Sequence, residues 1–217
     1  MNKILLFNPR STNHKARLPN SVLQVAASIP SNQEWIIVDG NLESDPHGKI
    51  FEYLSTGEFL FFGCTVMPGP QLKQAIPITK AIRNTYPNVK IIWGGYFASN
   101  QYKSVINSDW IDVIINGPGD KAFPQLLIAL ENNLPLEHIG NIIYKKGTEI
   151  IVTKKDPLYE QDTLPELPYQ TLNKFYPIKR YLGKSYLGKN TIAYHSSFGC
   201  PFTCSFCAVV PIYEAKW

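Results

Sequence analysis

The sequence predicts an α/β protein whose first part is a doubly wound parallel sheet of five strands. Two observations carry this prediction. Short, nearly continuous apolar runs recur along the first 135 residues, and amphipathic stretches of helical length separate them. Continuous apolar runs are typical of parallel strands that helices cover on both faces, and their alternation with helices is typical of a doubly wound sheet. The expected strands are residues 4–7, 35–38, 59–63, 89–93 and 113–115.

The loops that follow these strands are the candidate binding region of the first part. Amphipathic stretches at residues 71–86 and 122–132 are expected helices. Right-handed crossovers bring every strand-to-helix loop to one edge of the sheet, where ligands bind in this architecture. Glycine in such a loop lets the backbone approach a ligand closely, although glycine and proline also simply make turns. The candidate ligand-contacting residues are Asn8, Pro9, Gly63, Thr65, Gly94, Gly95, Gly117 and Gly119.

Composition and missing motifs exclude several functional classes. The 217 residues are 44% hydrophobic and 18% charged, as in soluble globular proteins. The net charge of +4 comes from scattered lysines, so no nucleic-acid partner is expected. A phosphate-binding loop is not expected, because no G-x-G-x-x-G follows the first strand and no G-x-x-x-x-G-K-[ST] occurs in the sequence. No apolar stretch is long enough for a membrane span, and four cysteines with three in one cluster fit a reducing, cytoplasmic location.

The pattern changes after residue 135. Residues 141–144 and 149–153 flank a Lys-Lys-Gly-Thr turn and predict a β-hairpin. Residues 156–177 are rich in proline and aromatic side chains and predict an extended connector. Residues 191–197 predict a strand that leads into a cysteine-containing loop. The expected organisation is a first domain over residues 1–135, a hairpin and connector over 136–190, and the beginning of a second α/β domain over 191–217.

Three closely spaced cysteines are the most specific feature of the chain. Cys200, Cys204 and Cys207 form a C-x-x-x-C-x-x-C run in which Phe206 directly precedes the last cysteine. Three thiolates at this spacing are suited to hold one soft metal centre. An iron–sulfur cube held by three cysteines keeps one iron without a protein ligand, and a cofactor or substrate can bind there. The spacing therefore favours an iron–sulfur site.

Other roles for these cysteines remain open at this stage. Zinc could be held by the three thiolates together with His195, although structural zinc sites usually take two short ligand pairs and no second pair exists here. A disulfide would leave one thiol unpaired, and nothing marks the chain as secreted. Inert, buried cysteines would not require this spacing. Cys64, at the end of an apolar run, is expected to be such a buried, unreactive thiol.

With Phe206 in the aromatic position, the cysteine run resembles the C-x-x-x-C-x-Φ-C motif of radical S-adenosylmethionine (radical SAM) enzymes, and the whole chain resembles their cobalamin-binding class. The resemblance implies a Rossmann-like cobalamin domain, a connector and then the start of a partial TIM-type barrel. It also implies a [4Fe-4S] cluster on the three cysteines with Phe206 at the cofactor, together with S-adenosylmethionine and cobalamin as cofactors. The implied partners are a small-molecule substrate and an electron donor such as flavodoxin or ferredoxin, and the implied reaction is methyl transfer or a related radical reaction.

The chain departs from the family pattern at two of its loops. Turns that commonly read G-G-x-H and G-E-G-E in the family are Gly-Gly-Tyr-Phe at residues 94–97 and Gly-Pro-Gly-Asp at residues 117–120. The D-x-H-x-x-G loop, whose histidine coordinates cobalt in many other cobalamin proteins, is absent after the first strand. We therefore expect no histidine on the cobalt: neither His14 nor His47 has the required context, and His47 is expected at an exposed helix start.

The resemblance also carries an expectation about the extent of the chain. Ten residues follow Cys207, whereas a radical SAM barrel contains several further βα units that shield the reaction from water. The chain is thus expected to be the N-terminal portion of an enzyme, and to be inactive alone. The alternative is a non-catalytic module that binds cobalamin or a small ligand and carries a vestigial cysteine tail.

Overall fold

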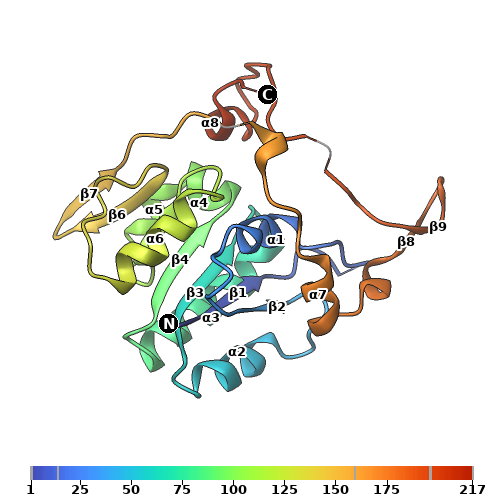
Figure 1. Cartoon of the computed structure of the whole chain (residues 1–217), viewed down its shortest axis with the longest axis horizontal. Coiled ribbons are helices and arrows are strands. Elements are labelled where there is room, and N and C mark those ends of the chain that lie inside the picture. Colours follow the sequence, from blue (N-terminus) through green and yellow to red (C-terminus); the bar gives the residue numbers. More distant parts are fainter. Residues whose placement is uncertain (1, 14, 159, 196, 217) are drawn as a thin grey trace.

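A computed structural model describes residues 2–13, 15–158, 160–195 and 197–216. Seven strands form one sheet in the order β2-β1-β3-β4-β5-β6-β7 (Figure 1). The first five pair in parallel, which confirms the predicted parallel sheet, and the last two pair antiparallel. The strands are β1 (Lys3–Asn8), β2 (Trp35–Asp39), β3 (Phe59–Thr65), β4 (Lys90–Gly94), β5 (Val113–Ile115), β6 (Ile142–Lys146) and β7 (Glu149–Val152).

The hairpin expected in the connector extends this sheet. β6 and β7 are the predicted hairpin, and β6 pairs with β5 from Val113–Tyr144 to Ile115–Ile142. Ile142 and Ile143 are fully buried, because they face the two hydrophobic layers on either side of the sheet. The hairpin therefore belongs structurally to the first part of the chain.

Helices cover both faces of the sheet, because the parallel strands are apolar on both sides. α1 (Asn20–Ala27) and α6 (Ala122–Glu131) bury their apolar side chains in one core, and Leu23 and Leu126 are fully buried there. The other core receives the helices that connect β2 to β5. These helices are α2 (Pro46–Leu54), α3 (Pro70–Thr85), α4 (Tyr96–Asn100) and α5 (Tyr102–Ile106).

The strand order creates a switch point beside β1. The chain leaves β1 for β2 on one side, and later returns to place β3 on the other side. Connections on the two sides run over opposite faces, so a crevice opens outside the carboxyl ends of the central strands. In this fold the crevice is the usual position of a ligand.

The connector contains helical turns between residues 161 and 181, so the prediction of an extended segment is wrong there. α7 (Tyr169–Phe175) follows a short 3₁₀ turn, η1 (Gln161–Thr163), and a second turn, η2 (Ile178–Tyr181), follows α7. Leu172 is fully buried against the core of α1 and α6. The connector is consequently packed on the sheet domain.

Two connector tyrosines hold this contact at the end of β2. The Tyr181 hydroxyl donates to Oδ2 of the fully buried Asp39 over 2.8 Å. The Tyr176 hydroxyl accepts from the Asp39 backbone N–H and donates to Glu43 Oε1. Burial, reinforced by the Asp39 carboxylate, raises the pKa of Tyr181 above its ordinary value, so its hydroxyl stays protonated as a donor.

We expect Tyr181→Phe to lower the free energy of unfolding by about 1–3 kcal/mol, because the buried Asp39 carboxylate loses a donor. Urea denaturation followed by circular dichroism measures the change. Tyr186→Phe is the matched control, since Tyr186 is 96% exposed and should leave the midpoint unchanged. Equal midpoints for Tyr181→Phe and Tyr186→Phe would contradict this role of Tyr181.

The segment beyond the connector leaves the main sheet. β8 (Gly183–Ser185) and β9 (Gly188–Thr191) form a separate hairpin that projects from the body (Figure 1). The strand expected over residues 191–197 is not formed: β9 ends at Thr191, residues 192–195 and 197 have no regular structure, and residue 196 lies outside the described residues. α8 (Val210–Tyr213) then lies beyond the carboxyl ends of the strands (Figure 1). Across the described residues, every helix is too short or too polar to span a membrane.

Candidate functional site

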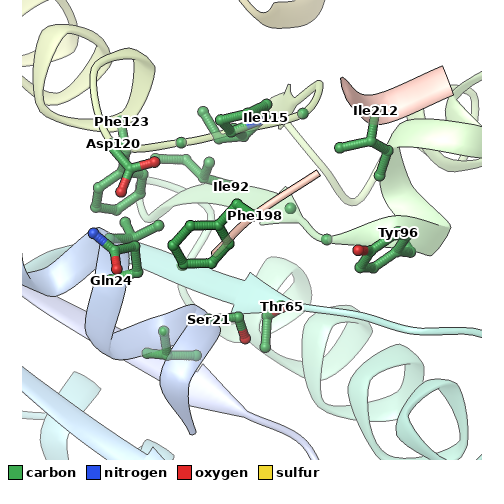
Figure 2. A pocket seen from close by; sticks show the side chains of 18 of the residues that line it. Ser21, Gln24, Thr65, Ile92, Tyr96, Ile115, Asp120, Phe123, Phe198 and Ile212 are labelled. Carbon is green, nitrogen blue, oxygen red and sulfur yellow. The ribbon is translucent and has the colours of Figure 1, made fainter. Parts of the chain in front are cut away.

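A cavity of about 240 Å³ lies at the carboxyl ends of the central strands. Its floor comes from the ends of β3, β4 and β5, and one wall comes from α1 and the start of α6. The C-terminal segment adds Phe198, Ile212 and Tyr213 to the lining. Figure 2 shows Phe198 and Ile212 at the cavity. This is the crevice that the strand order predicts. Six of the candidate loop residues line it together: Gly63, Thr65, Gly94, Gly95, Gly117 and Gly119.

Two of these glycines lie where a side chain would be crowded. Gly95 has φ +90, and a Cβ there would lie 2.8 Å from the Val66 carbonyl oxygen. A Cβ at Gly119 would lie 3.1 Å from Val25 Cγ2, where α1 packs against the loop after β5. Because these positions are glycine, the loop after β4 packs closely on the loop after β3, and the loop after β5 packs closely on α1.

The cavity is largely apolar but holds two unpartnered polar atoms. Nε2 of Gln24 and Oδ1 of Asp120 are fully buried and have no hydrogen-bond partner among the described residues. Both residues line the cavity, and Figure 2 shows them at the same end of it. Buried polar atoms are usually paired, so these two atoms retain unused hydrogen-bonding capacity at this end of the cavity.

Phe198 lies within the cavity, only two residues before Cys200 (Figure 2). Its backbone is held at two points by the side chain of Gln161: the Phe198 N–H donates to Oε1 over 2.6 Å, and Nε2 donates to the Phe198 carbonyl over 3.0 Å. The connector thus fixes the start of the cysteine segment against the cavity. Any occupant that displaces Phe198 also moves the cysteine segment.

Asn8 and Pro9, the two other candidate ligand-contacting residues of the strand ends, do not line the cavity. Nδ2 of Asn8 donates to Asp39 Oδ1 over 3.0 Å, and the Pro9 carbonyl accepts from Gln71 Nε2 over 3.1 Å. The loop after β1 is therefore engaged in holding the ends of β2 and α3. These two residues support the edge of the sheet, away from the cavity.

The structure places the three clustered cysteines on one segment but does not gather their sulfurs. Cys200 and Cys207 are half-buried and Cys204 is exposed. The Cys207 N–H donates to the Cys204 carbonyl, and the Cys200 N–H donates to the Lys216 carbonyl. Among the described residues, no three Cys, His, Asp or Glu side chains lie close enough together to hold a metal ion. The donor set itself, three thiols, suits an iron–sulfur centre, and metal binding commonly shapes such a loop.

The cysteine segment docks on the sheet domain through α4. Asn100 Nδ2 donates to the Ala208 carbonyl over 3.2 Å, and Lys155 Nζ donates to the Pro211 carbonyl. Cys207 and Phe206 line a second, shallower cleft of about 480 Å³ at this contact. The Phe206 side chain is 91% exposed, so it does not contribute to the first cavity.

No described histidine lines the cavity, whereas the remaining cysteine, Cys64, is among its lining residues. His47 is exposed at the start of α2 and stacks on Phe51, as predicted. His14 lies outside the described residues. His195, the alternative zinc ligand, is 3.2 Å from Asn20 Nδ2 and is not grouped with the cysteines. Cys64 is buried as predicted, and this burial raises the pKa of its thiol well above the ordinary value.

Several cavity residues could not be found from sequence patterns. Gln24, Phe198 and Tyr213 have no motif that marks them, and they reach the cavity only through packing. Burial, with smaller contributions from Tyr96 and Asp120, raises the pKa of Tyr213 to about 12, so its phenol is neutral near pH 7. Asp120 belongs to the Gly-Pro-Gly-Asp turn and could have been included because that turn follows a predicted strand.

Curated relatives of the chain are enzymes. No protein-family model matches the sequence. An anaerobic magnesium-protoporphyrin IX monomethyl ester cyclase of Synechocystis sp. is 27% identical over 131 residues, which are 60% of this chain and 25% of that enzyme. An uncharacterized methyltransferase of Pyrococcus horikoshii is 23% identical over 223 residues, which are 99% of this chain and 47% of that protein.

Solved structures share the fold over nearly the whole chain. TsrM of Kitasatospora setae, a radical S-adenosylmethionine methyltransferase solved with cobalamin and a [4Fe-4S] cluster bound, superposes with a TM-score of 0.70 at 18% identity, over 98% of this chain and 42% of that chain. The cobalamin-dependent S-adenosylmethionine radical enzyme OxsB, solved with aqua-cobalamin and S-adenosylmethionine bound, gives a TM-score of 0.76 at 16% identity, over 95% and 28%.

These comparisons confirm the predicted resemblance. The chain has the α/β fold of cobalamin-dependent radical SAM enzymes, and its curated relatives include a cyclase and a methyltransferase. It spans between 25% and 47% of the lengths of the relatives described.

Proposed function

We propose that this chain is the cofactor-binding portion of a cobalamin-dependent radical SAM enzyme that carries out methyl transfer or a related radical reaction. The observation that carries the proposal is the glycine-lined cavity at the carboxyl ends of the strands, with the three-cysteine segment docked against it. The cavity suits an organic cofactor and the three cysteines suit an iron–sulfur cluster. The fold shared with TsrM and OxsB supports the presence of both in one chain. The domain limits at residues 135 and 190 are also proposed, with the β6–β7 hairpin after residue 135 continuing the sheet of the first domain.

The cavity residues fit part of a cobalamin. Gly94, Gly95, Gly117 and Gly119 leave backbone surface free for close approach, and the unpartnered atoms of Gln24 and Asp120 offer a donor and an acceptor. The volume of about 240 Å³ is below the roughly 300–1,000 Å³ of typical cofactor pockets, so one end of the cofactor enters here while the rest lies outside. When bound, cobalamin supplies methyl-transfer chemistry.

The three cysteines fit a [4Fe-4S] cluster by donor type and spacing. Cys200, Cys204 and Cys207 would bind three irons, and S-adenosylmethionine would bind at the fourth, with Phe206 beside it. Reductive cleavage of S-adenosylmethionine is the chemistry that such a cluster supplies when bound. An electron donor such as flavodoxin or ferredoxin and a reducing, cytoplasmic location follow from this proposal. The exposed Cys204 and Phe206 leave the segment open to water, so we expect the 217 residues alone to cleave S-adenosylmethionine negligibly.

Cobalamin binding tests the proposal without requiring turnover. No histidine is among the described residues that line the cavity, so the bound cofactor should have no imidazole from the protein on its cobalt. We expect the chain to retain cobalamin through gel filtration and to change its electronic spectrum to the base-off, histidine-off form. His47→Ala is the matched control and should leave the spectrum of the bound cofactor unchanged. Loss of cobalamin on the column, or a spectrum identical to that of free cobalamin, would contradict the proposal.

The alternative is a non-catalytic module that binds cobalamin or another small ligand. The sulfurs that are not gathered and the exposed Cys204 favour this alternative. It predicts ligand binding in the cavity without any iron on the cysteines. Iron and sulfide analysis of the cobalamin-loaded protein after anaerobic reconstitution separates the two functions.

A further inference from the structure

The polar end of the cavity is formed where two helices meet. Val25 of α1 packs against Gly119, because a Cβ on Gly119 would lie 3.1 Å from Val25 Cγ2. Gln24 and Asp120 are the chain neighbours of these two residues, so the contact brings them to the same end of the cavity (Figure 2). The Gln24 amide Nε2 is a donor, whereas the Asp120 carboxylate Oδ1 is an acceptor.

Neither atom is satisfied within the described part of the protein. Both are fully buried and lack a hydrogen-bond partner there. A buried polar group without a partner costs about 1–3 kcal/mol, so an apolar pair at these two positions would give a more stable empty protein. Asp120 lies two residues before α6, whose N-cap position is Lys121, and its Oδ1 makes no hydrogen bond among the described residues. Both side chains therefore retain unused hydrogen-bonding capacity in the lining of the cavity.

The combination of a donor with an anionic acceptor selects the chemistry of that ligand. Gln24 Nε2 requires an acceptor atom, and Asp120 Oδ1 requires a donor atom. A phosphate or carboxylate would satisfy Gln24 but would be repelled by Asp120 at short range in an apolar cavity. A neutral group that offers one acceptor and one donor satisfies both.

We propose that Gln24 and Asp120 are specificity-determining residues that together bind a neutral donor–acceptor group of the cofactor, such as a carboxamide. This inference rests on the proposed function, because it takes cobalamin as the ligand of the cavity. In cobalamin the group comes either from a carboxamide side chain of the corrin or from a hydroxyl of the nucleotide ribose. Cobinamide keeps the corrin carboxamides and lacks the nucleotide, so it distinguishes the two sources.

The test measures cobalamin affinity and stability of the empty protein in the same variants. We expect Gln24→Leu and Asp120→Ala each to weaken cobalamin binding about tenfold, the effect of one lost hydrogen bond to a buried group. The midpoint of urea unfolding of the empty Gln24→Leu protein should stay the same or rise, because an unpaired buried atom is removed. Asp120→Asn keeps a side-chain carbonyl acceptor and should bind within about threefold of the parent. Gln125→Leu, the same substitution at an exposed position of α6, is the control for both measurements.

The outcomes separate this inference from the proposed function. If the parent protein fails to bind cobalamin, the proposed function fails and the inference falls with it. If the parent binds and Gln24→Leu binds equally well, only the inference is overturned. Loss of binding in Asp120→Asn would also overturn it, because it would show recognition of a cation by the carboxylate. If Gln24→Leu also weakens the binding of cobinamide, the recognised group is a corrin carboxamide. If Gln24→Leu leaves cobinamide affinity unchanged, the recognised group belongs to the nucleotide.

Discussion

Replacement of Cys200, Cys204 or Cys207 by alanine should abolish the iron–sulfur cluster that the parent chain forms on anaerobic reconstitution with iron and sulfide. A cube held by only two thiolates would have two irons without protein ligands, so each single substitution should act almost completely. The measurement is bound iron and acid-labile sulfide per chain, together with the absorbance of the brown protein. The parent should hold about four irons per chain.

Cys64→Ala is the control for this experiment, because Cys64 is a buried thiol with a raised pKa at the end of β3. This variant should bind as much iron as the parent. Iron retained by Cys204→Ala but lost from Cys64→Ala would reverse the assignment of the ligands. Stoichiometric zinc without sulfide in the parent protein would show that the cysteines hold zinc and not an iron–sulfur cluster.

Gly95→Ala should destabilise the sheet domain by about 2–5 kcal/mol and remove cobalamin binding. The φ of +90 is unfavourable for alanine. In addition, the new Cβ would lie 2.8 Å from the Val66 carbonyl oxygen and 2.9 Å from Thr65 Oγ1. Val66 cannot give way easily, because its N–H donates to the Gly94 carbonyl and its carbonyl accepts from the Phe97 N–H. The backbone strain and the steric overlap therefore both lower the free energy of unfolding, and their effects add.

The control for Gly95→Ala is Gly57→Ala. Gly57 also has a positive φ, +74, but no atom lies within 4 Å of the position of its Cβ. This variant should show only the backbone strain of about 1–2 kcal/mol and should keep cobalamin binding. Thermal or urea unfolding measures both variants. Equal destabilisation by the two substitutions would contradict the close approach of the Gly95 backbone to β3 and its following loop.

The parallel sheet could be predicted because its strands are apolar on both faces, as in Phe59–Thr65 and Val113–Ile115. The position of the β6–β7 hairpin in the sheet could not be predicted, because nothing local in Ile142–Lys146 specifies antiparallel pairing with β5. The strand expected at residues 191–197 is absent for a physical reason. Ile192 and Tyr194 are 42% and 74% exposed, so no apolar surface covers them among the described residues, and a strand without a partner is not stable.

The candidate site could be predicted only where one residue type determines the geometry. Gly95 and Gly119 are found from sequence because close backbone approach requires glycine after a strand. Gln24 and Phe198 are found only in the structure, because they enter the cavity through packing between distant segments. Asn8 follows the first strand as a candidate ligand-contacting residue, but its side chain donates to the buried Asp39 and does not line the cavity.

The most direct test of the account is a single sample in which both proposed cofactors are counted. The chain is reconstituted anaerobically with iron, sulfide and cobalamin, passed through gel filtration, and analysed for cobalt, iron, sulfide and zinc. We expect about one cobalamin and about four irons with sulfide per chain. Protein that elutes without cobalamin and carries zinc without sulfide would contradict it.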